Sequence, residues 1–212
     1  MKKLQDLKIG EVFKYACFDW IKLDDLEDGT LAIMKDKLPD TRRFDGDSNN
    51  WKSSKLRNWL NENFLHELID NGAKKDDFLW FKRDLTADDG TKGDGCYGYC
   101  ADMLSLITCE EYRKYRNLMP IIDNWWWTLT PYSCMEKYSH IVHIVHYDGS
   151  LDWHHVSYDI PSVRPICNLK SEIMVSNSDD EVNKDELVTQ ITEDITQRIL
   201  NVIETYKQEV EK

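Results

Sequence analysis

The sequence predicts an α+β protein that builds antiparallel sheets and two helices from its first 176 residues. Three observations support this prediction. Strand-forming residues flank Asp148-Gly149 between Tyr138 and Tyr158, which is a strong short-range signal for a β-hairpin. Residues 55–69 carry apolar side chains at helical spacing. The composition changes at Asn177, where a polar stretch begins that leads into an amphipathic helix.

The N-terminal part predicts an antiparallel meander of three strands at 12–15, 18–23 and 30–34. Asp28-Gly29 supplies the turn into the third strand. Side chains alternate along the second strand, so one set faces away from the other. The first set is Phe18, Trp20 and Lys22, and the second is Asp19, Ile21 and Leu23.

Two helices follow from local signals. Ser53-Ser54 offers an N-cap for a helix through Ile69, and Asn71-Gly72 ends it. A second helix covers 109–116, where Thr108 and Glu111 have the spacing of a capping box. The apolar stripe of the first helix consists of Leu56, Trp59, Leu60, Phe64 and Leu68.

Further strands are predicted at 78–86, 101–108 and 171–176, with an acidic loop at 84–95. The three consecutive tryptophans at 125–127 also predict a strand, because each can bury roughly 150–250 Å². Neighbours on a strand point to opposite faces, so Trp126 opposes the other two. We expect this strand to be covered on both sides and central in its sheet.

The sequence divides into a domain at 1–176, a polar linker at 177–185 and an amphipathic helix at 186–212. Isolated helices of this length are marginal in water, so we expect the last one to pack back, to oligomerise or to dock a partner. Its apolar side consists of Leu187, Ile191, Ile195, Ile199, Val202, Tyr206 and Val210.

The chain has 212 residues, a net charge of −12 and a pI of about 4.9. This balance argues against direct binding to nucleic acid or to anionic membranes, since both need clustered lysine and arginine. No apolar run approaches the ~20 residues of a membrane span, and no signal peptide is visible. The six cysteines are therefore expected to be thiols in an intracellular protein.

Five motifs follow one another along the chain. They are Asn49-Asn50-Trp51-Lys52-x-Ser54-x-Leu56-Arg57-x-Trp59-Leu60-Asn61, Asp84-Leu85-Thr86-x-Asp88-Asp89-Gly90, Ser105-Leu106-x-Thr108, Trp125-Trp126-Trp127-x-x-Thr130-Pro131 and Val163-Arg164-Pro165. In this order they resemble an uncharacterised family of phages and prophages of Gram-positive bacteria. The similarity covers roughly residues 7–176 and implies a bacterial cytoplasmic location and a host or phage protein as partner.

The aromatic strand, the hairpin and the closing Val163-Arg164-Pro165 are also similar to C-type-lectin-like domains. These include the formylglycine-generating-enzyme fold and the variable proteins of diversity-generating retroelements. Ser162 stands where such domains usually carry glycine. The resemblance implies a stable sheet on which residues 132–160 display a binding face. The cysteine chemistry of the formylglycine enzyme is not carried over, because its motif has no counterpart here.

The candidate partner-binding residues lie in this region, where aromatic side chains could act as rigid anchors. They are Tyr132, Tyr138, His143, Tyr147, Asp152, Trp153, His154 and Tyr158.

A two-residue turn at Asp148-Gly149 would place His143 opposite His154 and Val145 opposite Asp152. His143, His154 and Asp152 could then hold a structural divalent metal such as Zn²⁺. A register change of one residue would dismantle this set. We favour the alternative interpretation, a polar partner-contacting face with neutral histidines and no cofactor.

Other candidate chemistry is weaker. Asp84, Asp88, Asp89 and Asp94 could offer oxygen ligands to Ca²⁺, but their spacing is not that of an EF-hand, and a solvated acidic turn is favoured. Cys134 could pair with His140 or His154, although nothing in the spacing demands it. Arg164 is expected to be a structural hydrogen-bond or ion-pair partner.

The sequence thus favours a non-enzymatic protein that binds another macromolecule. The net charge and the family resemblance suggest one version, an acidic, anti-CRISPR-like inhibitor of a nucleic-acid-targeting defence complex. The alternatives are a sugar-binding or adhesin-like module and a metal-dependent enzyme that uses the hairpin histidines.

Overall fold

The computed structural model describes residues 1–91, 97–177, 192, 195 and 196. The chain divides into two compact units, Met1–Asn177 and Ser178–Lys212. The last strand of the first unit includes Asn177, the first residue of the predicted linker. The rest of the linker and, apart from three residues, the predicted helix at 186–212 with its role in oligomerisation or docking lie outside the described residues.

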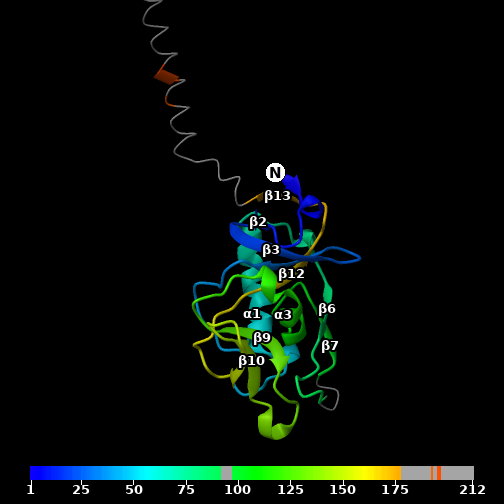
Figure 1. Cartoon of the computed structure of the whole chain (residues 1–212), viewed down its shortest axis with the longest axis vertical. Coiled ribbons are helices and arrows are strands. Elements are labelled where there is room, and N and C mark those ends of the chain that lie inside the picture. Colours follow the sequence, from blue (N-terminus) through cyan, green and yellow to red (C-terminus); the bar gives the residue numbers. More distant parts are fainter. Residues whose placement is uncertain (92–96, 178–191, 193–194, 197–212) are drawn as a thin grey trace, which may run out of the picture. The chain divides into compact units, whose positions relative to one another are not determined.

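The larger sheet of the first unit contains eight strands that pair antiparallel throughout (Figure 1). The predicted N-terminal meander is confirmed and forms its middle. In spatial order the strands are β1 (Lys2–Lys3), β13 (Met174–Asn177), β2 (Val12–Tyr15), β3 (Phe18–Asp25), β4 (Thr30–Met34), β12 (Ile166–Leu169) and β5 (Phe78–Leu79), while β8 (Leu104–Ser105) also pairs with β12.

Two smaller antiparallel sheets complete the strands of this unit. The three-stranded sheet has the order β11 (Leu151–His155), β10 (Ile141–Val145) and β9 (Trp126–Pro131). The two-stranded sheet pairs β6 (Phe81–Asp84) with β7 (Tyr99–Asp102).

The single strand predicted at 101–108 is wrong, because β7 and β8 belong to different sheets. The side chain of Asn61 explains the break, since its Oδ1 accepts hydrogen bonds from the backbone amides of Met103 and Leu104. These amides are satisfied without a strand partner. The strand predicted at 78–86 is likewise divided between β5 and β6.

Residues 55–70 form one helical run, made of α1 (Lys55–Trp59), a π-helical segment η3 (Leu60–Phe64) and α2 (Leu65–Asp70). Ser54 Oγ caps it by accepting from the amide of Arg57, as predicted. The capping box of α3 (Cys109–Tyr115) is also confirmed. Short 3₁₀ segments are η1 (Leu4–Asp6), η2 (Trp51–Ser53), η4 (Lys75–Asp77), η5 (Arg116–Leu118) and η6 (Glu136–Tyr138).

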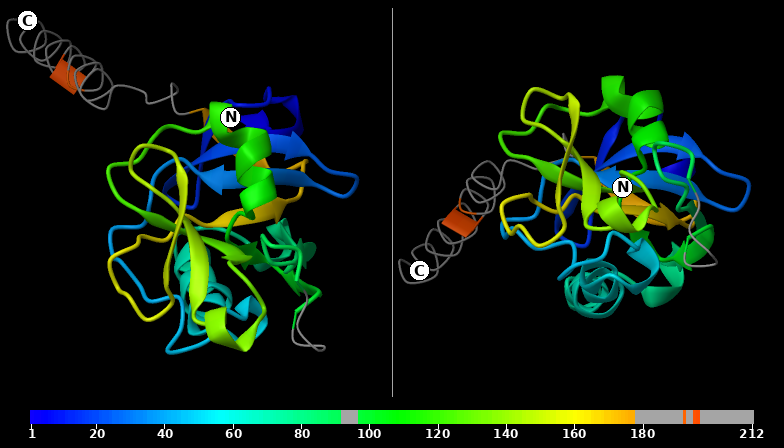
Figure 2. Two further views of the ribbon diagram at one scale, coloured as in Figure 1. Left: turned by 60° about the horizontal axis from the view of Figure 1, so that its bottom comes forward. Right: turned by 90° about the horizontal axis from the view of Figure 1, so that it is seen from below.

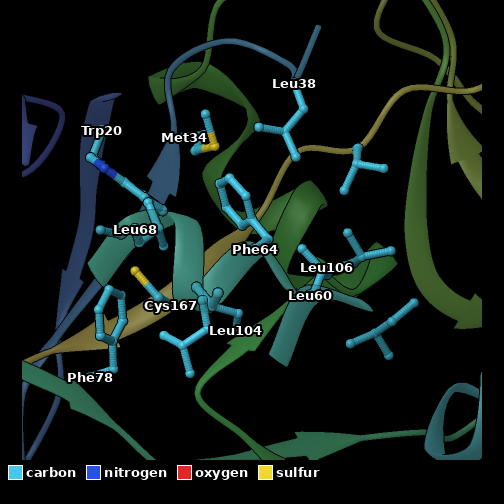
Figure 3. Close-up of a cluster of buried hydrophobic side chains, with 14 of the residues drawn as sticks. Trp20, Met34, Leu38, Leu60, Phe64, Leu68, Phe78, Leu104, Leu106 and Cys167 are labelled. Atoms are coloured by element: carbon cyan, nitrogen blue, oxygen red, sulfur yellow. The ribbon is translucent and has the colours of Figure 1, made fainter. Parts of the chain in front are cut away.

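The middle strands of the large sheet are buried on both faces. Residues alternate between two hydrophobic clusters, so that Ile33 packs in one and Ala32 and Met34 pack in the other. The 55–70 helical run fills the first cluster with Leu60, Phe64 and Leu68 (Figure 3). Helix α3 fills the second with Tyr112 and Tyr115. Figure 2 shows the two helices, cyan and green, on opposite sides of the strands.

Strand β9 uses the same alternation. Trp126 packs in the second cluster and Trp127 in the first, and both are fully buried, as predicted. The expectation that this strand is central in its sheet is wrong. Strand β9 pairs with β10 on one side, while its other side makes only isolated contacts, including a parallel bridge between Trp126 and Ser162.

A buried carboxylate ties the helical run to the sheets. Asp102 accepts hydrogen bonds from Trp51 Nε1 at 2.8 Å, from Arg57 Nε at 2.6 Å and from Ser105 Oγ at 3.1 Å. Its side chain is completely inaccessible to solvent. Such a charge is tolerable only because a cation and two further donors satisfy it.

Gly29 provides a stability test at the β3–β4 turn. A Cβ there would lie 2.7 Å from the carbonyl oxygen of Leu169 and 2.8 Å from Leu79 Cδ1. We predict that Gly29→Ala lowers the free energy of unfolding by about 1–3 kcal/mol through overpacking. Gly46→Ala is the matched control, because its nearest neighbour atom would be 3.8 Å away. Urea unfolding measures both variants, and equal stabilities would contradict the tight packing at Gly29.

Candidate functional site

The hairpin of β10 and β11 turns through a three-residue loop, Tyr147-Asp148-Gly149, rather than through the two-residue loop that the sequence predicted. The His146 amide donates to the Ser150 carbonyl at 2.8 Å and closes the loop. Gly149 has a φ of +79°, which suits the left-handed last position of such a loop. Asp148 Oδ1 accepts from both the amide and the hydroxyl of Ser150 and rigidifies the turn.

The extra loop residue moves the strand register by one position. His143 lies opposite Trp153, Ile144 opposite Asp152, and Val142 opposite His154. His143 and His154 therefore point to opposite faces of the sheet, and the predicted metal set of His143, His154 and Asp152 does not form. The described residues contain no group of three or more histidine, cysteine or acidic side chains placed to hold a metal ion.

His143 is buried on one face of this sheet, with Tyr132 against its ring at a centroid distance of 5.7 Å. Its Nδ1 lies 3.1 Å from the carbonyl oxygen of Asp152, so Nδ1 carries the proton in the neutral ring. Nε2 lies 3.5 Å from Asp88 Oδ2. Burial lowers the pKa of His143, and the charge of Asp88 opposes this effect without overcoming it. The contact with Asp88 is therefore not an ion pair at neutral pH.

The other hairpin histidines belong to aromatic contacts. His154 packs between Trp125, at 5.4 Å between ring centroids, and Tyr158, at 4.3 Å. Burial and the neighbouring His155 lower the pKa of His154. His154 Nδ1 accepts from the amide of His155, which places the ring proton on Nε2. These histidines are packing elements with fixed ring orientations.

Three aromatic side chains stand exposed on and beside the outer strand β11. The exposed fractions are 56% for Tyr147, 48% for Trp153 and 45% for Tyr158. Asp152 is also exposed. We call these four residues the hairpin surface; it includes both faces of β11, because Trp153 shares a face with His143 whereas Asp152 points to the other face. Tyr132 packs beneath Trp153 at a ring centroid distance of 6.1 Å, and Tyr138 packs against Tyr132 at 5.6 Å. Of the eight predicted contact residues, four are exposed and four support them.

Two outward amides of β11 are bonded to its own side chains. Because the residues at 152 and 154 pair with β10, the amides of Trp153 and His155 point away from the sheet. Asp152 Oδ1 accepts from the first at 2.8 Å, and His154 Nδ1 accepts from the second at 2.9 Å. An edge strand whose outward amides are already hydrogen-bonded is less able to pair with another strand. This favours contact of a partner with the side chains of β11 over addition of a strand.

Asn49 positions the loop that leads into β10, a role that the sequence did not predict. Its fully buried Nδ2 donates to the carbonyl oxygens of Ser133 at 2.9 Å, Ile141 at 2.8 Å and Tyr138 at 3.2 Å. The hydroxyl of Tyr97 donates to Asn49 Oδ1. In the sequence this role is marked only by the position of Asn49 in a polar stretch before a helix.

The acidic loop uses its carboxylates locally. Asp84 and Asp89 each accept from the amide and the hydroxyl of the threonine two residues later. Asp88 pairs with Arg113 at 3.1 Å, and the loop borders a pocket of about 330 Å³. Asp94 lies outside the described residues. This arrangement supports the acidic turn rather than the Ca²⁺ site.

None of the five cysteines in the described ranges forms a disulfide. Burial raises the pKa of Cys100 and of Cys109 to about 11. Cys134 Sγ donates to the carbonyl oxygen of Thr91. Arg164 is confirmed as a structural hydrogen-bond donor, since Nε and Nη2 donate to the carbonyls of Met34 and Lys35.

The buried state of His143 makes stability depend on pH. The unfolded chain binds a proton at a pKa near 6.5, whereas the folded pKa is lower. We predict that the free energy of unfolding decreases as pH falls below about 6.5, because the unfolded state takes up the proton first. His143→Met should reduce this slope. An NMR titration that placed the pKa of His143 above 6.5 would contradict the interpretation.

We compared the chain with known protein families, curated proteins and solved structures. No protein-family model matches the chain, and no curated protein or solved structure is significantly similar to it. Among the described residues, none of the helices has the length and apolar character needed to cross a membrane. The structure therefore establishes an α+β architecture with mostly antiparallel sheets, and the site must be interpreted from its own geometry.

Proposed function

We propose that this protein is a non-enzymatic binding protein that contacts a macromolecular partner through the hairpin surface of Tyr147, Asp152, Trp153 and Tyr158. One observation carries the proposal. Two outward amides of the outer strand are bonded to its own side chains, while Trp153 in the strand and Tyr147 and Tyr158 beside it are each about half exposed. Tyrosine and tryptophan are enriched among the residues that dominate binding energy, so this combination favours recognition by side chains.

The support beneath the surface favours the same function. Tyr132 and His143 pack below Trp153, and Asn49 fixes the loop that delivers β10. Side chains held in one orientation before binding lose less entropy on association, which improves affinity. A rigid scaffold with aromatic anchors is typical of a binding surface.

The charge of the protein suggests the chemistry of the partner. The net charge is −12, and Asp148, Asp152 and Asp159 are exposed on and near the hairpin surface. A partner with a basic surface would be attracted over a distance of about 8–10 Å in physiological salt. A nucleic-acid-targeting complex has such a surface, so inhibition of a host defence complex is the specific version that we propose.

The resemblance of the motifs to phage proteins and to C-type-lectin-like domains is compatible with this proposal. The α+β architecture with antiparallel sheets and two helices supports it at the level of fold class, and the relationship to those domains is part of our proposal. A sugar-binding module is the second candidate, because the exposed ring of Trp153 could stack on a sugar.

Two tryptophans provide a matched test. Trp153 and Trp80 are both exposed, at 48% and 58%, but only Trp153 belongs to the hairpin surface. We predict that Trp153→Ala weakens binding of a partner captured from host lysate by at least tenfold, on the order of 2 kcal/mol for a central aromatic anchor. Trp80→Ala should leave the affinity unchanged.

Quantitative affinity capture of the full chain, followed by titration of the recovered protein, measures this difference. Equal binding by wild type and Trp153→Ala would exclude the hairpin surface as the contact. Specific binding on a glycan array, lost with Trp153→Ala and without a protein partner, would replace the proposal with the sugar-binding function.

A further inference from the structure

A pocket of about 250 Å³ lies between the C-terminal end of α3, the hairpin turn and β9, apart from the hairpin surface. It has a positive lining in a strongly acidic protein. Two arginines line it, and its lining contains neither aspartate nor glutamate.

Arg164 lies beneath the pocket and is fully buried. Its guanidinium donates to the carbonyls of Met34 at 2.8 Å and Lys35 at 2.7 Å and lies 5.1 Å from the ring centroid of Trp126. Within the described ranges, no carboxylate lies within 4 Å of it. Burial lowers its pKa to about 10, and the more distant Asp36 opposes this effect. A buried cation without an acidic partner keeps a favourable potential for an incoming anion.

Arg116 supplies an accessible cation at the pocket. It is exposed, and its Nη2 donates to the Gly149 carbonyl at 3.2 Å. The hydroxyl of Tyr112 donates to the same carbonyl at 2.8 Å, so the hairpin turn and α3 are joined at this point. No carboxylate of the described residues pairs with Arg116 either. Its planar guanidinium retains donors that suit the two oxygens of a carboxylate.

The remaining lining combines polar groups of Asn117, His146 and Tyr112 with an apolar side. Met119, Ile122, Trp126 and Val145 are buried, and Ile121 is 72% exposed beside them. The volume is smaller than the roughly 300–1,000 Å³ typical of sites for drug-sized ligands. The pocket therefore fits one anionic head and a short hydrocarbon body, and is too small for a nucleotide.

We propose that this pocket binds a carboxylate attached to a small apolar group, with Arg116 in direct contact and Arg164 providing positive potential from below. Two sources share this chemistry. One is a free branched or aromatic acid, and the other is the C-terminal residue of a polypeptide. The proposal is independent of the hairpin surface, since no residue of that surface lines the pocket.

The first test titrates the full chain with 4-methylpentanoate and with its neutral amide, while the indole N–H signal of Trp126 is followed by NMR. The acid should bind about tenfold more tightly than the amide, because only the acid forms charge-assisted hydrogen bonds. Absence of binding, or equal binding of the acid and the amide, would overturn the proposal.

Arg116→Gln should weaken binding of the acid about tenfold, as expected when a charged donor is lost. Arg43→Gln is the matched control, because it removes the same charge from an exposed residue that does not line the pocket, and it should bind as wild type does. Arg164→Met, checked for folding by circular dichroism, should also weaken binding. Unchanged affinity in Arg116→Gln would contradict the assignment even if Arg164→Met fails to fold.

A second pair of probes distinguishes the sources. Acetyl-Gly-Gly-Leu is titrated with a free carboxylate and with a C-terminal amide. Tighter binding of the free-carboxylate peptide than of 4-methylpentanoate supports capture of a chain terminus. The reverse order supports a free acid.

Discussion

The structure depends on strands whose two faces are both buried. Along β4 and β9 neighbouring hydrophobic residues pack in different clusters, as Trp126 and Trp127 show. A shift of one position would exchange these side chains between clusters that have different shapes, so the strand positions are strongly determined. The 55–70 helical run and α3 cover opposite faces of the large sheet, and the β10–β11 hairpin belongs to the smaller sheet that packs on this base.

Buried polar groups then connect this base to the surfaces that could bind ligands. Asn49 holds the loop before β10, Asp102 joins Trp51 and Arg57, and Arg164 joins two chain segments about 130 residues apart. All of these residues come from, or contact, the motifs that suggested a family. The motifs therefore describe the scaffold, whereas the exposed aromatic residues on and beside β11 are outside them. This separation suits a scaffold that can carry different binding surfaces.

The sequence predicted what local signals determine and missed what distant contacts determine. The meander, the Ser54 cap and the Thr108 capping box followed from alternation and short-range hydrogen bonds. The hairpin was found, but its register was wrong, because Asp148-Gly149 occurs in both two-residue and three-residue loops. The break before β8 was missed because Asn61, more than 40 residues away, satisfies the backbone there. The carbonyl partners of Arg164 were missed for the same reason, because they lie about 130 residues away in the sequence.

The register of β10 and β11 determines the site, because it separates His143 from His154 and places Trp153 opposite His143. NMR tests it directly through contacts between Hα atoms of opposed residues. His146 and Ser150 form a hydrogen-bonded pair, and hydrogen-bonded pairs alternate with non-hydrogen-bonded pairs along the two strands. His143 and Trp153 are therefore a non-hydrogen-bonded pair, in which the α-carbons are about 4.5 Å apart. The structure predicts a strong nuclear Overhauser effect between Hα of His143 and Hα of Trp153. A strong effect between Hα of His143 and Hα of His154 would contradict it and restore the metal set.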